Sequence, residues 1–591
     1  MSWIFSISKT QKPDHEVSSY YHETPLHSIS TPRFYLAVGG NPDTVFWENN
    51  KERLTGWAVV GIGILNKESH ASILKHNDWA QLISQKSFDA TSLDGHFVAI
   101  RWNNNQLECF TDQLGLRTVY FTTYPQGVCI STRLDWLART TGREEIDFES
   151  LGDRWLMFNQ VSYDSCLVGI GRIGPQGRAT FKDGVVTEST NTPWLPSFEP
   201  QTASAALDTL KTFVECALNY PLTPSLGLSG GLDSRLLLSL LTSSSTGRYV
   251  THTFGDPRDP DVRVAKQITS TLRIPHQLFN EPIPAAEKSI SAICSYVAQT
   301  LLIEPATSFL KLRYYPILRE EGRMMIDGGF GEIARRQYLN RLVRLGGSAL
   351  RTRDTSRVFS LMRSGRADIF SREATILLKN GARRSLDKAL SEMPAIEKIG
   401  VENFADLFAL RTRIPNYGAP EQARLDGDVL NFMPLVQPSF LRAVFGIPTK
   451  LRSNARLYFG FIRKLNPSLA QFPLANSDNT YPFGLSSNLS WLVTKIKSRL
   501  GGGGTDPNPH SLLSNLKEYV LDVAHSSVVV TNSMYDSRKV TEAVTKYYQG
   551  ELNQRNTVDW WLTFELWKRS LSSNANESPD QSFLTETQST R

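Results

Sequence analysis

The sequence lacks several features that mark membrane, secreted or metal-scaffold proteins. No apolar run reaches the length of about 18 residues that a membrane-spanning helix needs. The N-terminus lacks the charged-then-apolar order of a signal peptide. The five cysteines lie far apart and form no CxxC pair, which favours reduced, mostly buried thiols over a disulfide or zinc framework. We therefore expect a cytoplasmic protein without a membrane span.

The chain also carries no large excess of charge of one sign. The net charge is only +6 over 591 residues, so charge alone does not indicate nucleic acid binding, and we expect no nucleic acid partner. Hydrophobic residues make up 40% and charged residues 21% of the chain, as in ordinary globular proteins. The length exceeds that of a single core and predicts about two to four domains.

The most informative segment of the chain is the run SGGLDS at residues 229–234. It follows the apolar residues 226–228 and precedes the apolar stretch 235–241. This order predicts a buried strand that ends at Leu228, a glycine-rich turn, and a helix that begins near Leu232. Backbone N–H groups in such a turn, together with the helix N-terminus, bind phosphate. The Walker pattern is absent, since no Gly-Lys-Ser/Thr follows the turn.

The side chains of this run also suit a phosphate ligand. Ser229 and Ser234 add hydroxyl groups, and the Asp233 carboxylate would repel phosphate unless a magnesium ion lies between them. A glycine-rich turn that merely opens a core helix is the simpler alternative. The complete pattern after a strand resembles the PP-loop of ATP pyrophosphatases, which bind pyrophosphate and release AMP. This resemblance implies ATP and Mg²⁺ as ligands, with Gly230 and Gly231 also in contact with the nucleotide.

Composition divides the chain into two main parts. Residues from about 30 to 195 are rich in β-branched and aromatic residues between turn signals, which predicts strands at 56–65, 96–102 and 118–122. Three prolines between 193 and 200 indicate a linker. We therefore predict an N-terminal domain over 1–192, a linker over 193–202, a second domain over 203–571 and a disordered tail over 572–591, with a flexible tether at 501–504.

The second part alternates helices and strands, which predicts a parallel sheet. Helical spacing covers 203–220 and 261–272, and a second strand is predicted at 249–254. Ligands bind parallel sheets at the carboxyl ends of the strands. Leu228 and Phe254, at two such ends, are therefore candidates for flanking an adenine ring.

Residues from about 335 to 420 are predicted to be mainly helical and are rich in arginine. Six arginines and no acidic residue lie between Arg335 and Arg353. A solvated helical face explains this run, and a surface that binds an anionic substrate or partner is the alternative.

The chain resembles the asparagine synthetase family, in which a glutaminase domain is fused to an ATP-dependent synthetase domain. Besides the PP-loop, the segments that carry this resemblance are 93–100, 112–120, 168–177 and 432–435. The resemblance covers most of residues 30–570. It implies an α/β protein with an N-terminal layered, β-rich, Ntn-hydrolase-like domain, followed by a parallel-sheet PP-loop domain with a mainly helical C-terminal part. A homodimer is also possible.

The N-terminal domain departs from the family pattern. A glutaminase of this family uses a cysteine exposed as its first residue, whereas residue 2 here is Ser and the first cysteine is Cys109. Residues 61–67 stand where the family has a glutamine-binding Asn-Gly-Glu. We therefore expect no glutaminase activity. A serine nucleophile at Ser2 after removal of Met1 is the alternative.

The second synthetase motif of the family is also altered. Its place is taken by residues 327–332, and an ungapped alignment puts Glu332 where the family has a metal-binding aspartate. The resemblance implies that Asp233 and Glu332 hold one Mg²⁺ on the β- and γ-phosphates and that Asp327 and Gly328 line the nucleotide site. A glycine-rich turn with an acidic residue at a helix N-terminus is the alternative. Phe459 takes the place of the family's lysine.

The family chemistry implies an ATP-dependent ligase that forms an amide bond. Such an enzyme adenylates a carboxylate, releases pyrophosphate, and lets ammonia or an amine displace AMP. The carboxylate could belong to a small molecule, a peptide or a sugar acid. A catalytically degenerate ATP-binding or scaffold protein is the first alternative, and a glutamine-hydrolysing asparagine synthase is the second.

Overall fold

The computed structural model describes residues 1–9, 23–67, 70–125, 127–244, 248–476, 479–485 and 508–572. The predicted tether at 501–504 lies outside the described residues, as does the predicted tail apart from residue 572.

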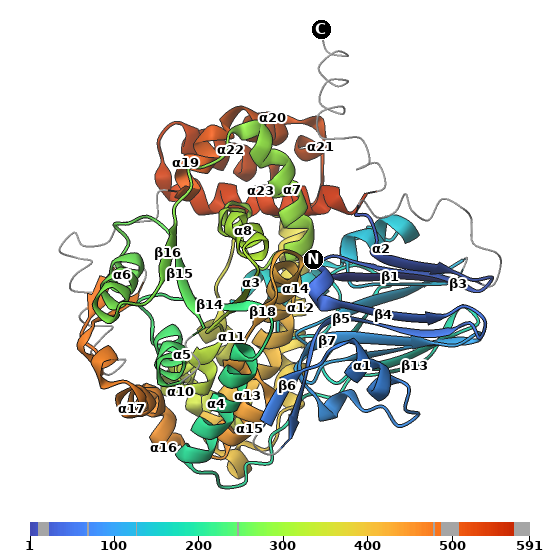
Figure 1. Cartoon of the computed structure of the whole chain (residues 1–591). Coiled ribbons are helices and arrows are strands. Elements are labelled where there is room, and N and C mark those ends of the chain that lie inside the picture. The colour runs from blue at the N-terminus through green and yellow to red at the C-terminus, as the bar shows by residue number, and fades with distance from the viewer. Residues whose placement is uncertain are drawn as a thin grey trace.

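Two antiparallel sheets form the N-terminal part (Figure 1). The first has the order β11 (Gly171–Ile173), β9 (Val119–Tyr124), β10 (Gly127–Ser131), β1 (Trp3–Lys9), β3 (Phe34–Gly39) and β2 (His27–Ser30). The second has the order β13 (Val185–Thr190), β12 (Arg178–Lys182), β8 (Gln106–Thr111), β7 (Asp94–Trp102), β5 (Thr55–Lys67) and β4 (Val45–Asn50), with β6 (His70–Ile73) paired to β5. The predicted strands at 56–65, 96–102 and 118–122 are thus confirmed as β5, β7 and β9.

Successive side chains of a strand point to opposite faces of the sheet, so this part is built in layers. On β5, Ala58 and Val60 join the apolar layer between the two sheets, whereas Trp57 and Val59 face the opposite side. There they pack with Trp79 of α1 (His76–Ile83). Residues of β1 pack likewise against α2 (Leu134–Thr141) on the far side of the first sheet. The result is a helix–sheet–sheet–helix arrangement.

The five strands of the third sheet are all parallel. Their order is β16 (His276–Phe279), β15 (Val250–Phe254), β14 (Thr223–Gly227), β17 (Arg323–Ile326) and β18 (Asn431–Phe432). Two predicted helices are confirmed as α5 (Leu232–Ser243) and α6 (Pro260–Leu272). The chain moves outward from β14 through β15 to β16 and then returns to the other side of β14 with β17. The order of strands therefore reverses between β14 and β17.

Helices make up most of the remaining chain. Between the sheets and within the second part they are α3 (Phe148–Leu156), α4 (Ala203–Leu218), α7 (Ala286–Thr300), α8 (Tyr315–Glu320), α9 (Gly331–Ala334), α10 (Asn340–Thr352), α11 (Thr355–Met362), α12 (Arg372–Ser391), α13 (Ile396–Arg413), α14 (Ala419–Asp428), α15 (Pro438–Phe445), α16 (Thr449–Arg452) and α17 (Arg456–Leu465). The chain then forms the short hairpin β19 (Leu474–Asn476) and β20 (Asn479–Tyr481). It ends in α19 (Asn508–Asn515), α20 (Lys517–His525), α21 (Ser527–Val530), α22 (Ser537–Tyr548) and α23 (Arg555–Ser570), the red group of Figure 1.

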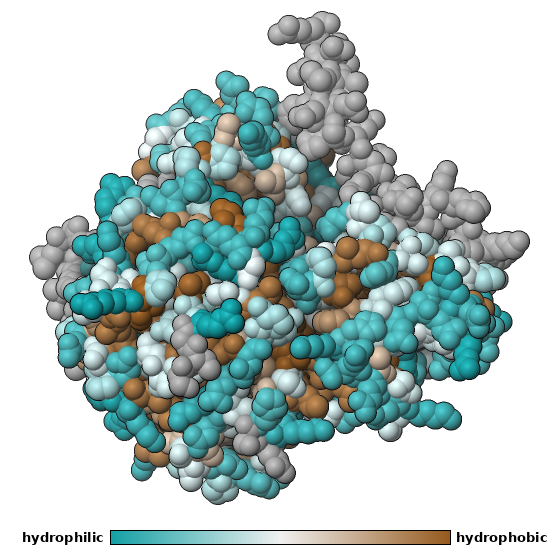
Figure 2. All heavy atoms as spheres, in the orientation of Figure 1, coloured by the Kyte–Doolittle hydropathy of each residue, from teal (hydrophilic) through white to brown (hydrophobic). Residues whose placement is uncertain are grey.

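The N-terminal sheets and the parallel-sheet part share buried contacts. Ile62 and Leu116 of the first part belong to the same apolar cluster as Leu226 and Ile326 of the second. Polar groups also cross this boundary, since Ser439 donates to both carboxylate oxygens of Asp94, through its N–H at 2.8 Å and its hydroxyl at 2.7 Å. In Figure 2, hydrophobic residues lie in patches along the middle of an otherwise mostly hydrophilic face.

Two further expectations concern cysteines and membranes. All five cysteines are free thiols, and four of them are buried. Among the described residues, no helix combines the length and the apolar character that a membrane span requires.

A buried ion pair at the boundary gives a first prediction. Arg117 and Asp426 are in direct contact, and their side chains are 1% and 0% exposed. Asp426→Ala leaves the guanidinium buried without its carboxylate, and we expect it to lower the free energy of unfolding by about 3–5 kcal/mol. Urea denaturation measures this loss. Glu542→Ala, which removes an exposed i,i+4 pair with Lys546, is the control and is expected to leave the urea midpoint nearly unchanged.

Candidate active site

The point where the strand order reverses brings the two predicted motifs together. β14 and β17 are parallel neighbours, with Leu226 opposite Ile326. The segments that follow them, 228–234 and 327–332, therefore leave the sheet side by side at its carboxyl edge. Such reversal points form the ligand crevice in open parallel sheets. The predicted positions of the two motifs are thus adjacent in the structure.

Hydrogen bonds fix the backbone of the glycine-rich loop at residues 228–234. The Ser229 N–H donates to the Ser234 hydroxyl at 3.2 Å, and the Gly231 N–H donates to the Ser229 hydroxyl at 3.1 Å. The Gly230 N–H donates to the Asp261 carboxylate at 2.8 Å. Gly231 is the residue before α5, and no side chain caps the helix there. The first N–H groups of α5 therefore remain available to an anion.

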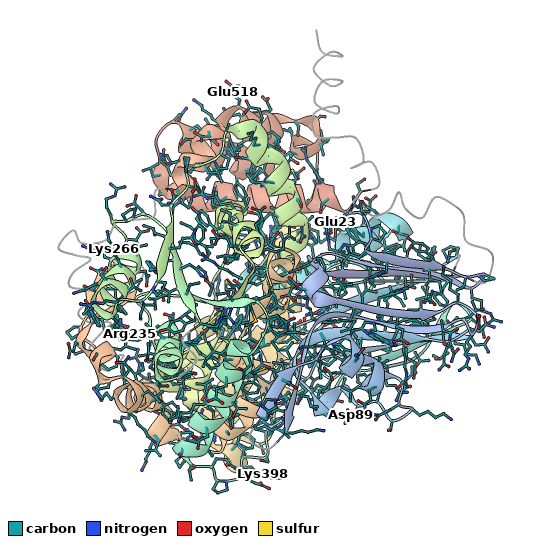
Figure 3. All side chains as sticks on the ribbon, viewed as in Figure 1. Glu23, Asp89, Arg235, Lys266, Lys398 and Glu518 are labelled. Carbon is teal, nitrogen blue, oxygen red and sulfur yellow. The ribbon has the colours of Figure 1, made fainter. Side chains whose placement is uncertain are left out.

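The β19–β20 hairpin supports this loop from outside. The Gly230 carbonyl accepts the Ala475 N–H at 2.9 Å, and a Cβ at Gly230 would lie only 2.4 Å from the Ala475 Cβ. Arg235 of α5, labelled in Figure 3, is fully buried and donates to the carbonyls of Phe472 (2.8 Å) and Pro473 (2.7 Å). Glycine is therefore required at position 230 for the close approach of the hairpin.

Three carboxylates gather beside the loop. Burial raises the pKa of Asp233 to about 6, the negative charges of Glu332 and Asp327 add to the rise, and Arg335 opposes it. The pKa of Asp327 is also raised, mainly by burial, although its carboxylate accepts the Gly329 N–H at 2.8 Å. The turn that carries Asp327 and Glu332 also lies against Asp233, since a Cβ at Gly328 would be 3.2 Å from the Asp233 Cβ.

Two guanidinium groups pair with two of these carboxylates. The Arg335 Nη2 donates to Asp233 Oδ2 at 3.1 Å, and its Nε lies 2.9 Å from Oδ1 in an ion-pair contact without hydrogen-bond geometry. Arg413 lies 3.4 Å from Glu332 and stacks over the rings of Tyr338 and Tyr417. Both predicted metal ligands are thus ion-paired.

The donor set suits Mg²⁺ only together with phosphates. Within the described part of the chain, no three His, Cys, Asp or Glu side chains are placed to hold a metal. Carboxylate oxygens are suitable ligands, and Mg²⁺ is commonly held by one or two carboxylates plus substrate phosphates rather than by an all-protein cage. Asp233 and Glu332 would be the residues that hold it.

The two residues predicted to flank adenine lie in different surroundings. Leu228 is 1% exposed and belongs to the main apolar cluster. Phe254 stacks on Tyr314 with ring centroids 5.0 Å apart and also contacts Phe279. Their contact with adenine remains a prediction.

The arginine-rich run divides into two groups. Arg335 and Arg336 turn inward, and Arg336 pairs with the buried Asp406 at 3.4 Å. The other four are exposed: Arg341, Arg344, Arg351 and Arg353. The solvated-face interpretation therefore fits these four, whereas Arg335 belongs to the site.

Ser2 is enclosed at the boundary between the two parts. Its side chain is 0% exposed, and its hydroxyl contacts Thr44 Oγ1 at 2.6 Å and accepts the Asn41 N–H at 3.1 Å. Burial also lowers the pKa of the Met1 amino group. With Met1 in place, the Ser2 hydroxyl is enclosed among polar groups of the boundary.

Several site residues escaped prediction from the sequence. Arg413 comes from a helix far along the chain, and no local pattern marks it as a partner of Glu332. The sequence does contain an indication for Arg335. This residue follows Glu332 by three positions, so the two side chains lie on the same side of a helical turn. Asp261 lies at the start of α6, and its carboxylate accepts the Gly230 N–H, a contact that no local pattern indicates.

Comparisons with known proteins assign no function to this site. No protein-family model and no curated protein matches the chain. One similar solved structure is the allosteric regulatory enzyme of purine biosynthesis, with 10% identity and a TM-score of 0.20 over 38% of this chain and 54% of that one. Another is glutamine phosphoribosylpyrophosphate amidotransferase from B. subtilis, complexed with ADP and GMP, with 10% identity and a TM-score of 0.20 over 57% of this chain and 71% of that one. The chain thus spans about half of the first structure, and TM-scores this low support no conclusion.

The packing of Gly331 on Asp233 gives a second prediction. A Cβ at Gly331 would lie 2.5 Å from Asp233 Oδ1, so Gly331→Ala must displace the carboxylate or the α9 backbone. We expect the affinity for Mg²⁺–ATP to fall about tenfold or more, since a charge-assisted contact contributes about 1.5–3 kcal/mol. Isothermal titration calorimetry measures the change. Gly365→Ala, at a glycine with no atom within 4 Å of the added Cβ, is the matched control and is expected to bind like the wild type.

Proposed function

We propose that this protein binds ATP at residues 228–234 and uses it to activate a carboxylate as its acyl adenylate, which ammonia or an amine then attacks. The observation that carries the proposal is the meeting of the complete SGGLDS loop with residues 327–332 where the strand order reverses. This is the ATP-dependent carbon–nitrogen ligase chemistry that the resemblance to the asparagine synthetase family implies.

Each group of the site has a role in the proposal. The N–H groups at the start of α5 bind phosphate oxygens, and Asp233 and Glu332 hold Mg²⁺, which would offset the charge that develops on the departing pyrophosphate. Ser229, Gly230, Gly231 and Ser234 shape the loop. Asp327 and Gly328 approach from β17, and a Cβ at Gly328 would lie 3.2 Å from the Ser234 N, so glycine permits that approach. Leu228 and Phe254 are proposed to flank the adenine.

The N-terminal part is proposed to be a glutaminase-like domain that no longer hydrolyses glutamine. Its helix–sheet–sheet–helix layering is compatible with the Ntn-hydrolase-like arrangement that the resemblance implies. The enclosed Ser2 hydroxyl argues against a serine nucleophile. The amine would then come from free ammonia or from an amino group of the substrate. The domain boundaries at 192 and 203, the homodimer and the nature of the carboxylate remain part of this proposal.

A scaffold protein that binds ATP without turnover is the second candidate. Phe459, at the place of the family's lysine, packs on Phe483 with ring centroids 4.9 Å apart and cannot stabilise charge as a lysine does. The ion pairs of Asp233 and Glu332 with arginines also favour this candidate.

Pyrophosphate release tests the proposed function. We expect release from ATP in the presence of a panel of carboxylates and ammonia, dependent on Mg²⁺ and abolished by a chelator. Asp233→Asn is expected to lower the rate at least about 100-fold, since it removes a carboxylate that is proposed to hold the Mg²⁺ that would offset the charge on the pyrophosphate. Asp208→Asn, at an exposed carboxylate of α4, is the matched control and should retain the wild-type rate.

The same assay separates the alternatives. ATP binding without release for any carboxylate would favour the scaffold protein. Release stimulated by glutamine and lost in Ser2→Ala would contradict the proposal for the N-terminal domain. Equal rates in Asp233→Asn and the wild type would exclude the assigned site.

A further inference from the structure

Tyr458 lies beside the glycine-rich loop with an unsatisfied hydroxyl group. It belongs to α17, which packs against α5, and its side chain is 0% exposed. Within the described part of the chain, its Oη has no hydrogen-bond partner. Buried tyrosine hydroxyls ordinarily have a partner, because burying one without a hydrogen bond is unfavourable. A phenylalanine would fill the same space without this penalty.

Packing places Tyr458 near the charged groups of the site. Its helix packs against α5, which carries Asp233, and the charges of Asp233, Arg335 and Glu332 act on its phenol. Burial holds the pKa of the phenol well above its usual value, so the hydroxyl stays protonated and can donate. The neighbouring Phe459 faces Phe483 instead. Tyr458 is therefore the residue at this point of α17 that presents a donor to the site.

The backbone before Tyr458 holds this placement. Asn454 and Ala455 have φ values of 57° and 60°, the left-handed region that non-glycine residues seldom adopt. The Ala455 N–H donates to the Arg335 carbonyl at 3.2 Å, which ties the start of α17 to the residue that pairs with Asp233. Such conformations persist where surrounding contacts impose them, often at functional sites.

The missing partner is an anionic acceptor. Asp233 and Glu332 are ion-paired with guanidinium groups, although Asp233 Oδ1 accepts no hydrogen bond within the described residues, and Arg335 offers only donors. A phosphate group at the start of α5 would bring new acceptor oxygens between these residues. We propose that the Tyr458 hydroxyl donates a hydrogen bond to the pyrophosphate portion of the nucleotide bound at this loop. This inference rests on the proposed binding of ATP, but not on catalysis.

Calorimetry on the full-length protein tests the inference with three probes: Mg²⁺–ATP, inorganic pyrophosphate and AMP. Tyr458→Phe is expected to weaken the binding of ATP and of pyrophosphate about tenfold or more, because a hydrogen bond to a charged group is lost. The affinity for AMP is expected to stay unchanged. Its Tm should equal or exceed that of the wild type, because the variant removes an unpartnered polar group.

Tyr535→Phe is the matched control. The Tyr535 side chain is also buried, but its hydroxyl donates to Glu565 at 2.6 Å in the C-terminal helices. This variant should lower the Tm and leave all three affinities unchanged.

The outcomes are distinct. If Tyr458→Phe binds ATP and pyrophosphate like the wild type, or loses AMP affinity equally, the assignment of Tyr458 is wrong while the proposed ATP site stands. A Tm lowered as in Tyr535→Phe would also overturn it, because the hydroxyl would then have a structural partner. A wild type that binds neither ATP nor pyrophosphate would overturn the proposed function together with this inference.

Discussion

The accumulation of negative charge at the carboxyl edge of the parallel sheet constrains the whole site. Burial raises the pKa of Asp233 and of Asp327, and the negative charge of Glu332 adds to the rise at both. Ionised carboxylates in such a place need cations near them. Arg335 and Arg413 supply these cations. A metal ion or phosphate that binds here must therefore be accommodated beside two existing ion pairs.

The helix that carries Arg413 is itself irregular at this point. Between α13 and α14 the residues Ile414–Gly418 form a π-helical turn that contains Pro415. π-Helical turns occur frequently at functional sites, because the additional residue shifts the side chains that follow it. Here Arg413 stacks over Tyr417, and the Tyr417 hydroxyl donates to Glu304 at 2.9 Å. The irregular turn thus links the carboxylate site to a second set of buried polar groups.

The N-terminal sheets contribute to this site through packing. Arg117 pairs with Asp426 of α14 and also donates to the Ser2 carbonyl at 3.4 Å, while the Ser2 hydroxyl donates to the Asp426 carbonyl at 3.2 Å. The chain start, where a nucleophile would lie in a glutaminase, is therefore part of the boundary with the second domain.

The sequence by itself determined the local elements: the strand–turn–helix around residues 229–234 and the alternating strands of the N-terminal part, because turn residues and period-2 patterns act between near neighbours. It also placed Asp233 and Glu332 together through the resemblance. Only the tertiary structure decided that Arg335 pairs with Asp233, 102 residues away, that Ser2 is enclosed, and that Tyr458 is buried on a helix that packs against α5. These facts depend on the order of strands in the sheet and on which helices pack across it, and no local pattern encodes contacts between segments so far apart in the chain.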